Sequence, residues 1–251
     1  MAASGGNAVP PRHLGERALG AGCRVWFADL RDLDGVGDPR GDLLDLLSVG
    51  EHERRRALAL PADRDRFTVG VAMIRWCAGM HLGRAPGRVR VERRCSCGRP
   101  HGKPAIPGTG LHLSLSHSED AVVLAATTRA PIGVDVERME ARDTTGLASV
   151  ALHASERCLS PRDFYRYWCR KEAVLKATGA GLRVPPAEVV VSSPRESARL
   201  RGYRGRGEDW ALVDLASPEG YAAALCMLAP GPVEVVSDTA GGLRAALAGS
   251  S

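Results

Sequence analysis

Asp135 and Glu137 stand two residues apart in the alternating segment Ile132-Gly-Val-Asp-Val-Glu137. On a β-strand, residues two apart project from the same face, so both carboxylates lie together while Val134 and Val136 pack on the other face. Adjacent carboxylates repel each other unless a cation lies between them, and Mg²⁺ takes oxygen ligands and leaves room for water or substrate phosphates. The pair suggests a divalent-metal site; the alternative is an exposed strand that carries two solvated acids.

A third carboxylate lies in the segment from Trp168 to Leu182, where a helical pattern ends in a Gly-x-Gly-Leu sequence. Glu172 lies four residues after Trp168 and four before Lys176, so a helix places the three side chains on one side. Lys171 and Lys176 are two of only three lysines in a chain whose other cations are arginines. A salt bridge on an exposed helix would explain Glu172 and Lys176 but not the glycines after them. We expect Glu172 to complete a metal site, with the lysines beside phosphate oxygens.

Ser116 and His117 follow at the end of an alternating strand that begins at Leu111. A Ser–His pair suggests a hydrolase, but the sequence has no Gly-x-Ser-x-Gly segment to present a nucleophilic serine. We therefore expect this pair to hydrogen-bond a ligand phosphate; the alternative is a buried core histidine. Lys103, the third lysine, lies in the rigid turn His101-Gly-Lys-Pro104, which directs its side chain.

The elements that position these residues follow from length and periodicity. The 251 residues are 44% apolar and 25% charged, which is typical of a folded protein with one large domain or two small ones. Each half shows a strand, then helices, then several strands, which predicts an α+β fold of two related lobes. In the first helical region, Arg66 and Arg75 lie off the apolar stripe, and the simplest interpretation of these arginine-rich helices is a solvated face. Strands are expected at 23–30, 89–91, 111–115, 121–126, 132–136, 189–191, 210–215 and 221–228. Helices are expected at 41–82 with a break at Pro61, at 145–153 and at 161–178. Residues 240–251 are expected to form a weak helix or a tail.

The net charge indicates the kind of partner, and the search for membrane-spanning and secretory segments indicates the cellular location. The net charge of +5 predicts an anionic ligand or partner. The sequence has no apolar run of membrane-spanning length and no secretory leader, so we expect a cytoplasmic protein without a membrane partner. The seven scattered cysteines then favour thiols over disulfides. Cys95 and Cys97, with His101, could bind zinc, but a tight glycine-containing turn is the simpler interpretation.

Taken in order, these motifs resemble those of the 4′-phosphopantetheinyl transferases, specifically the larger monomeric, surfactin-type (Sfp-like) class. They follow the family's order and spacing over about Ser48 to Leu182. The matching pieces are Arg66 with the helix to Arg75, His101-Gly-Lys-Pro104, Ser114-Leu-Ser-His-Ser118, Gly133-Val-Asp-Val-Glu137 and Trp168-x-x-Lys-Glu-x-x-x-Lys-x-x-Gly-x-Gly-Leu182.

The resemblance implies a pseudo-twofold fold of two similar lobes, each a small antiparallel sheet packed with a long helix, with coenzyme A bound between them. It implies holo-[acyl-carrier-protein] synthase activity: Mg²⁺-dependent, or Mn²⁺-dependent, transfer of the 4′-phosphopantetheine group of coenzyme A to a serine of an apo acyl, peptidyl or aryl carrier protein, which releases 3′,5′-ADP. We expect a monomer. The expected divisions are a flexible arm over 1–22, an N-terminal lobe over 23–127, a C-terminal lobe with the carboxylates over 128–236 and a tail over 237–251.

By motif position, the resemblance implies that Asp135, Glu137 and Glu172 hold the metal ion against the coenzyme pyrophosphate. Glu172 or a metal-bound water would take the proton from the incoming serine, and Lys176 would stabilise the pyrophosphate charge. The implied catalytic residues are therefore Glu172, Asp135 and Lys176. The implied coenzyme contacts are Arg54, Arg66, Lys103, Ser116, His117, Lys171 and Lys176.

The chain also departs from the family pattern. Leu113 and Ser114 stand where the family often has an aromatic residue and an asparagine, and Glu51 stands near an expected basic position. The competing hypothesis is a basic nucleic-acid-binding protein without catalysis, but only 4% of the residues are aromatic, which leaves little for base stacking. We expect no nucleic-acid partner. The physiological carrier, the general base and the role of Cys95 and Cys97 stay open at this point.

Overall fold

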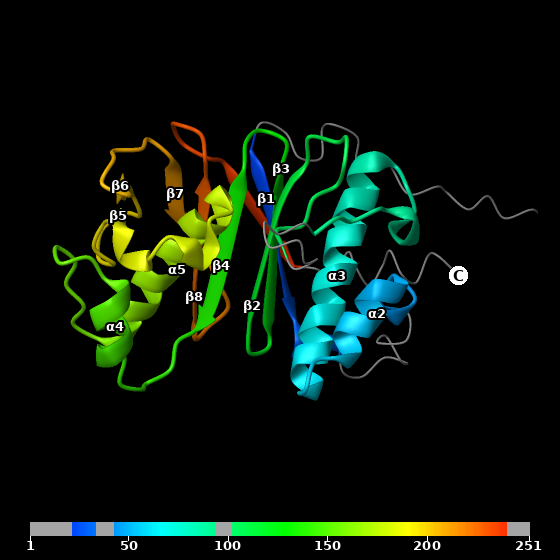
Figure 1. Cartoon of the computed structure of the whole chain (residues 1–251), viewed down its shortest axis with the longest axis horizontal. Coiled ribbons are helices and arrows are strands. Elements are labelled where there is room, and N and C mark those ends of the chain that lie inside the picture. Colours follow the sequence, from blue (N-terminus) through cyan, green and yellow to red (C-terminus); the bar gives the residue numbers. More distant parts are fainter. Residues whose placement is uncertain (1–21, 34–42, 94–101, 240–251) are drawn as a thin grey trace, which may run out of the picture.

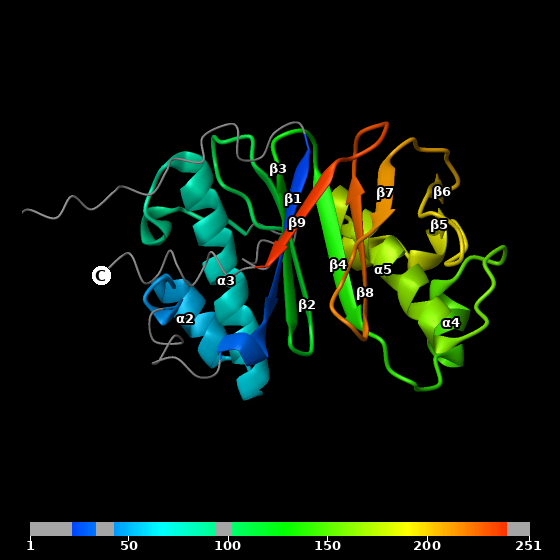
Figure 2. The same ribbon diagram turned by 180° about the vertical axis from the view of Figure 1, so that it is seen from behind.

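The computed structural model of the protein describes residues 22–33, 43–93 and 102–239. Two β-sheets stand face to face at the centre of the molecule, and helices cover the outer side of each sheet (Figure 1). Figure 2 shows the same four layers from behind. This arrangement confirms the expected α+β fold of two lobes. Residues 1–21 of the expected arm, the expected Cys95–Cys97 turn, His101 and the expected tail over 240–251 lie outside the described residues.

The N-terminal lobe contains a sheet of strands β1 (Cys23–Asp29), β2 (His112–Ser118), β3 (Ala121–Thr127) and β9 (Val235–Thr239). Their order is β2-β3-β1-β9. The pairs β2–β3 and β1–β3 are antiparallel, whereas β9 runs parallel to β1. The sheet is therefore mixed rather than purely antiparallel, because a strand from the far end of the sequence returns to pair with β1.

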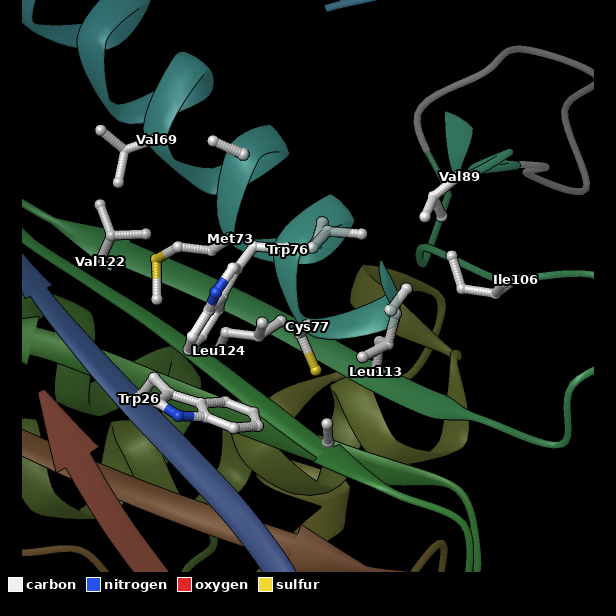
Figure 3. Close-up of a cluster of buried hydrophobic side chains, with 14 of the residues drawn as sticks. Trp26, Val69, Met73, Trp76, Cys77, Val89, Ile106, Leu113, Val122 and Leu124 are labelled. Atoms are coloured by element: carbon white, nitrogen blue, oxygen red, sulfur yellow. The ribbon is translucent and has the colours of Figure 1, made fainter. Parts of the chain in front are cut away.

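Helices α2 (Val49–Arg56) and α3 (Pro61–Leu82) cover the outer face of this sheet. Residues through the middle of α3 are buried, and Met73 and Trp76 pack among side chains from the sheet (Figure 3). The rings of Trp26 and Trp76 meet edge to face with their centroids 5.5 Å apart. An aromatic contact of this geometry stabilises the core beyond its buried area.

The prediction of a solvated face for Arg75 is wrong. Arg75 is 6% exposed and donates a hydrogen bond from Nη2 to Glu51 Oε2 at 2.7 Å. The same Glu51 oxygen accepts hydrogen bonds from the amide and hydroxyl of Ser48 at the start of α2. The acid at position 51 thus neutralises a buried guanidinium group and caps a helix.

The C-terminal lobe contains a second sheet with the strand order β4-β8-β7, in which both pairs are antiparallel. A separate two-stranded sheet joins β5 to β6. The strands are β4 (Ile132–Arg138), β5 (Val189–Val191), β6 (Leu200–Tyr203), β7 (Ala211–Asp214) and β8 (Tyr221–Met227); the helices are α4 (Thr145–Ala151) and α5 (Pro161–Thr178). Short 3₁₀ segments lie at Leu30–Leu33, Pro86–Arg88, Gly181–Arg183 and Pro186–Glu188.

Side-chain alternation along the central strands divides the apolar interior into layers. Val134 and Val136 of β4 pack with Val25 of β1 and Val123 of β3, in the layer between the two sheets. The intervening position, Asp135, is on the opposite face of β4, toward α5. The period-two pattern seen in the sequence therefore separates the layer that joins the lobes from the layer that holds charged side chains.

Helix α5 lies directly on β4, and local sequence sets both its ends. The Ser160 hydroxyl accepts a hydrogen bond from the Asp163 amide at 3.1 Å, and Gly179 ends the helix with φ of 68°. A side chain at Gly133 would overlap the carbonyl oxygen of Ala173 and the amide nitrogen of Ala177. Only glycine permits this close approach, so Gly133 determines how near the residues of α5 come to the strand carboxylates.

The periodicity predicts β5 and α5 with the observed bounds and most other elements to within a few residues. It does not predict β6 or β9, and the strand expected at 89–91 is absent from the described residues, where only an isolated bridge joins Glu92 to Ala105. The β9 strand also crosses the division expected between residues 236 and 237. No helix in the described ranges has the length and apolar character needed to cross a membrane.

Candidate active site

The centre of the candidate site is a three-residue contact between the lobes. Asp135 of β4 is 2% exposed, and its Oδ1 accepts hydrogen bonds from Ser116 Oγ at 2.8 Å and from Lys176 Nζ at 2.6 Å. Lys176 also donates to Ser116 Oγ at 2.6 Å. Strand β2 of the N-terminal lobe supplies Ser116, and strand β4 and helix α5 of the C-terminal lobe supply Asp135 and Lys176. Both lobes therefore contact one buried carboxylate.

Glu137 lies beside this contact, two residues farther along β4. Its Oε2 accepts a hydrogen bond from Ser118 Oγ of β2 at 2.9 Å. Burial raises the pKa of Glu137, and the negative charge of Asp135 raises it further. Hydrogen bonds from Ser118 and Trp168 and the charge of Lys176 oppose that increase. The carboxylate is therefore held in place in an environment that disfavours its charge.

Glu172 approaches the same region from α5. Burial raises its pKa, followed by the negative charge of Asp135, and Glu137 adds a smaller effect in the same direction. The positive charge of Lys176 opposes these effects. The expected three carboxylates are thus brought into one electrostatic environment, in which the charge of Asp135 disfavours ionisation of Glu137 and Glu172.

A divalent cation fits this environment by its chemistry. Asp135 Oδ2 is buried and has no hydrogen-bond partner among the described residues, and unsatisfied buried oxygens are rare in folded proteins. The donor set consists of carboxylate oxygens, which hard divalent cations prefer. A cation would complete the coordination of Oδ2 and relieve the repulsion that raises the pKa values of Glu137 and Glu172.

The carboxylates do not converge on a single point in this structure. Among the described residues, no group of three or more His, Cys, Asp and Glu side chains is arranged to hold a metal ion. Instead the Lys176 ammonium group neutralises Asp135. Binding of a cation would therefore require side chains to move, beginning with Lys176, because its ammonium group occupies Asp135 Oδ1. A surface hollow lined by residues such as Leu43, Arg55 and Thr68 lies elsewhere in the N-terminal lobe and contains none of the predicted site residues.

His117 and Arg66 form a basic group at the exposed side of the β2–β3 turn. The His117 side chain is exposed, but nearby protein atoms displace part of its hydration, and this lowers its pKa together with the positive charges of Lys176 and Arg66. Arg66 of α3 donates to Asp63 Oδ1 at 2.6 Å and to the Glu119 carbonyl oxygen at 2.6 Å. Glu119 has a left-handed backbone with φ of 47°. The turn that follows His117 is thus tied to α3.

Lys103 lies at the junction of β4 and the end of α5 rather than among the carboxylates. Its ammonium group donates hydrogen bonds to the carbonyl oxygens of Ile132, Lys176 and Ala177, of which the last two are 3.1 and 3.4 Å away. Burial lowers the pKa of Lys103 to about 8. A cation at these carbonyls complements the negative end of the helix dipole, so Lys103 attaches α5 to the start of β4.

Lys171 points into the interior of the C-terminal lobe. Its ammonium group is fully buried, forms an ion pair with Glu156 Oε2 at 2.6 Å and donates to the carbonyl oxygens of Val189 and Pro186. These contacts use all three donors of the ammonium group. Burial lowers its pKa, and the charge of Glu156 opposes that effect. The structure therefore does not bring Lys171 to the carboxylates, because position 171 lies on the inner face of α5.

Arg54 is likewise remote from the carboxylates, since its guanidinium group lies over the Phe67 ring, 5.2 Å from the centroid. The structure therefore brings together Asp135, Glu137, Glu172, Lys176 and Ser116, with His117 and Arg66 beside them. Two contacts lie outside the sequence-predicted site: Ser114, whose Oγ accepts a hydrogen bond from the Val134 amide at 3.0 Å, and Ser118. The repetition of serine at alternate positions of β2 is the signal that indicates them.

Comparisons with known proteins agree with this geometry. Residues 131–226 match the family model described as the 4′-phosphopantetheinyl transferase superfamily. The chain is 31% identical over 210 residues to the 4′-phosphopantetheinyl transferase HetI of Nostoc sp. (strain PCC 7120 / SAG 25.82 / UTEX 2576). The aligned region covers 76% of this chain and 84% of that protein. It is 28% identical over 191 residues to a 4′-phosphopantetheinyl transferase of Bacillus subtilis, at 70% and 73% coverage. It is also 30% identical over 136 residues to the 4′-phosphopantetheinyl transferase gsp of Aneurinibacillus migulanus, at 51% and 56% coverage.

Proposed function

This chain belongs to the 4′-phosphopantetheinyl transferase superfamily. We propose that its carboxylate cluster catalyses the transfer of 4′-phosphopantetheine from coenzyme A to a carrier protein. The hydroxyl oxygen of a carrier serine attacks the coenzyme phosphorus atom that bears pantetheine. The bond from this phosphorus to the bridging oxygen breaks, and 3′,5′-ADP leaves with the bonding electron pair. The serine proton passes to a base, so the products are holo carrier protein and 3′,5′-ADP.

One observation supports this proposal: Asp135 Oδ2 is buried, without a partner in the part of the chain that the structure describes, and lies beside two acids of raised pKa. Displacement at a pyrophosphate depends chiefly on position and on neutralisation of charge. We propose that Asp135, Glu137 and Glu172 hold a divalent cation, Mg²⁺ in the cell. When bound, the cation supplies a positive charge that withdraws electron density from the pyrophosphate.

The remaining roles are charge neutralisation, proton transfer and coenzyme binding, and different residues of the chain supply them. Lys176 neutralises Asp135 in the free protein, and we propose that its ammonium group moves to a pyrophosphate oxygen when coenzyme A binds. We propose that Glu172 accepts the serine proton, since Asp135 is engaged by Ser116 and Lys176 and Glu137 is engaged by Ser118. His117 and Arg66 lie beside this group and contact coenzyme phosphate, while Ser116 orients Lys176 and Asp135.

Of the other predicted coenzyme contacts, we place Lys103 and Lys171 in the scaffold, since their ammonium groups already bind buried carbonyl oxygens and, for Lys171, Glu156. Arg54, stacked on Phe67, stays a prediction. The holo-[acyl-carrier-protein] synthase type, the monomeric state and the cytoplasmic location also remain proposals from the sequence. The alternative of a nucleic-acid-binding protein receives no support from the relatives named above, which are all transferases.

The direct test is a mass measurement. The protein is incubated with coenzyme A, Mg²⁺ and a panel of apo acyl, peptidyl and aryl carrier proteins. We expect one phosphopantetheine group to be added to at least one carrier. Nucleic-acid binding without transfer to any carrier would contradict the proposal.

Glu172→Gln tests the base. The substitution keeps the size of the side chain but removes its basic oxygen, so we expect transfer to fall by about 10²-fold or more. Glu196→Gln is the matched control, because Glu196 is an exposed acid that pairs with surface Arg201 on the same lobe; it should transfer at the wild-type rate. Circular dichroism should show that both variants fold. An active Glu172→Gln protein would remove Glu172 from the reaction.

A further inference from the structure

Strands β2 and β4 lie side by side at the junction of the two lobes, one at the edge of each larger sheet (Figures 1 and 2). They belong to different sheets, and side-chain hydroxyl groups make the hydrogen bonds that join them. Ser114 Oγ accepts from the Val134 amide at 3.0 Å, and Ser118 Oγ accepts from the Arg138 amide at 3.1 Å. Both pairs are separated by the same number of residues along the chain, so the two strands run in the same direction. We call Ser114, Ser116 and Ser118 the serine row.

Ser118 combines two contacts that are separate elsewhere in the serine row: like Ser114 it accepts from a β4 amide, and like Ser116 it donates to a carboxylate. A serine hydroxyl group has one proton and two acceptor lone pairs. Because the Arg138 amide donates to the oxygen of Ser118, the hydroxyl proton remains free, and it is donated to Glu137 Oε2 at 2.9 Å. The backbone of β4 thus fixes the hydroxyl group that holds a β4 side chain.

We propose that Ser118 is a positioning residue for Glu137. Its hydroxyl group holds the Glu137 carboxylate toward the cation, so that cation binding depends on the contact between the lobes. The proposal rests on the function proposed above, in which Glu137 is a metal ligand. Groups that hydrogen-bond to metal ligands orient them, and their loss weakens metal binding by about 10–100-fold in other proteins.

Ser114 provides a matched control within the same row. Its hydroxyl group makes an equivalent hydrogen bond to the β4 backbone, but it bonds to no carboxylate among the described residues. Ser114→Ala and Ser118→Ala therefore each remove one hydrogen bond to the β4 backbone, while only Ser118→Ala also removes the bond to Glu137. Ser116 is unsuitable because it contacts both Asp135 and Lys176 directly.

The experiment measures Mn²⁺ binding without turnover. The full chain is saturated with coenzyme A, Mn²⁺ is added without any carrier protein, and free Mn²⁺ is followed by electron paramagnetic resonance against a blank that contains coenzyme A alone. We expect Ser118→Ala to weaken Mn²⁺ binding by about tenfold or more. Ser114→Ala should stay within about twofold, and Ser118→Thr, which restores a hydroxyl group, should recover most of the affinity.

Equal weakening in both alanine variants, or wild-type affinity in Ser118→Ala, would overturn the proposal. If Ser118→Ala does not fold, Ser118→Cys provides the same comparison, because a thiol of similar size is a weak donor. The function proposed above fails separately, since it requires the wild-type protein to modify a carrier. A wild-type enzyme that transfers phosphopantetheine and a Ser118→Ala variant that binds Mn²⁺ normally would reject only the role of Ser118.

Discussion

At the scale of single residues, the site is defined by how one buried carboxylate, Asp135, is neutralised. One of its oxygens binds Lys176 and Ser116, and the other has no partner within residues 22–33, 43–93 and 102–239. A buried carboxylate needs a compensating charge, which Lys176 provides in the protein described here. The same oxygen pair also suits a divalent cation, so the lysine and the cation are alternative sources of positive charge at Asp135.

Lys176→Met tests this exchange. The substitution keeps an apolar stem but leaves Asp135 without its cation, so in the absence of divalent ions we expect unfolding free energy to fall by about 1–3 kcal/mol. Excess Mg²⁺ should recover part of that loss, because the ion replaces the ammonium charge. Urea unfolding with and without Mg²⁺ measures both values.

The matched control is Arg201→Met, which removes an exposed cation from its pair with Glu196. Exposed pairs contribute little, so its effect should stay below about 1 kcal/mol and should not depend on Mg²⁺. If Mg²⁺ does not change the unfolding free energy of the Lys176→Met protein, the cation does not bind at Asp135.

At the scale of elements, the site depends on how closely α5 approaches β4. The helix carries Glu172 and Lys176, the strand carries Asp135 and Glu137, and Gly133 lets the two backbones touch. The ends of α5 follow from Ser160 and Gly179, which are local signals. The contact at Gly133 is tertiary, since nothing in the strand pattern indicates which helix covers it.

Gly133→Ala tests the close approach. The added methyl group would overlap the backbone of Ala173 and Ala177, so strand and helix must separate. We expect unfolding free energy to fall by about 1–3 kcal/mol, with a loss of transfer because the carboxylates move apart.

Gly50→Ala is the opposite control. Gly50 lies in α2, and apart from its own helix no atom of the described residues lies within 4 Å of the position that its added methyl group would occupy. This variant should be more stable by about 0.5–1 kcal/mol, because alanine favours the helix. Thermal unfolding of both proteins makes the comparison, and a stable Gly133→Ala protein would show that α5 is free to shift.

At the scale of the whole molecule, the chain crosses between the lobes more than once. It leaves the first lobe after β3, builds the second lobe from β4 to β8, and returns to pair β9 with β1. The Glu234 carbonyl oxygen also accepts a hydrogen bond from the Cys23 amide at 2.8 Å. The end of the described chain therefore ties the second lobe to the first, in addition to the layer of apolar side chains between the sheets.

Shortening the chain tests this tie. A protein that ends at Val233 lacks β9 and leaves one edge of β1 unpaired, so we expect a lower unfolding free energy and more self-association through that edge. A protein that ends at Thr239 keeps the strand and should unfold like the full chain. Urea unfolding measures the first effect and light scattering the second. If the two shortened proteins have the same unfolding free energy and the same degree of self-association, β9 does not stabilise the fold.

The sequence by itself determined the two-lobe α+β fold, the bounds of α5 and the candidate carboxylates, because these depend on short-range periodicity, caps and motif spacing. Asp135, Glu137 and Glu172 are visible as acids at strand and helix spacing, and their order with Ser116 and His117 indicates the family. Only the tertiary structure decided what each lysine contacts, that Arg75 is buried and that Ser118 holds Glu137. These outcomes depend on which residues distant along the chain share a surface, and α5, β2 and β4 meet only when both lobes have folded.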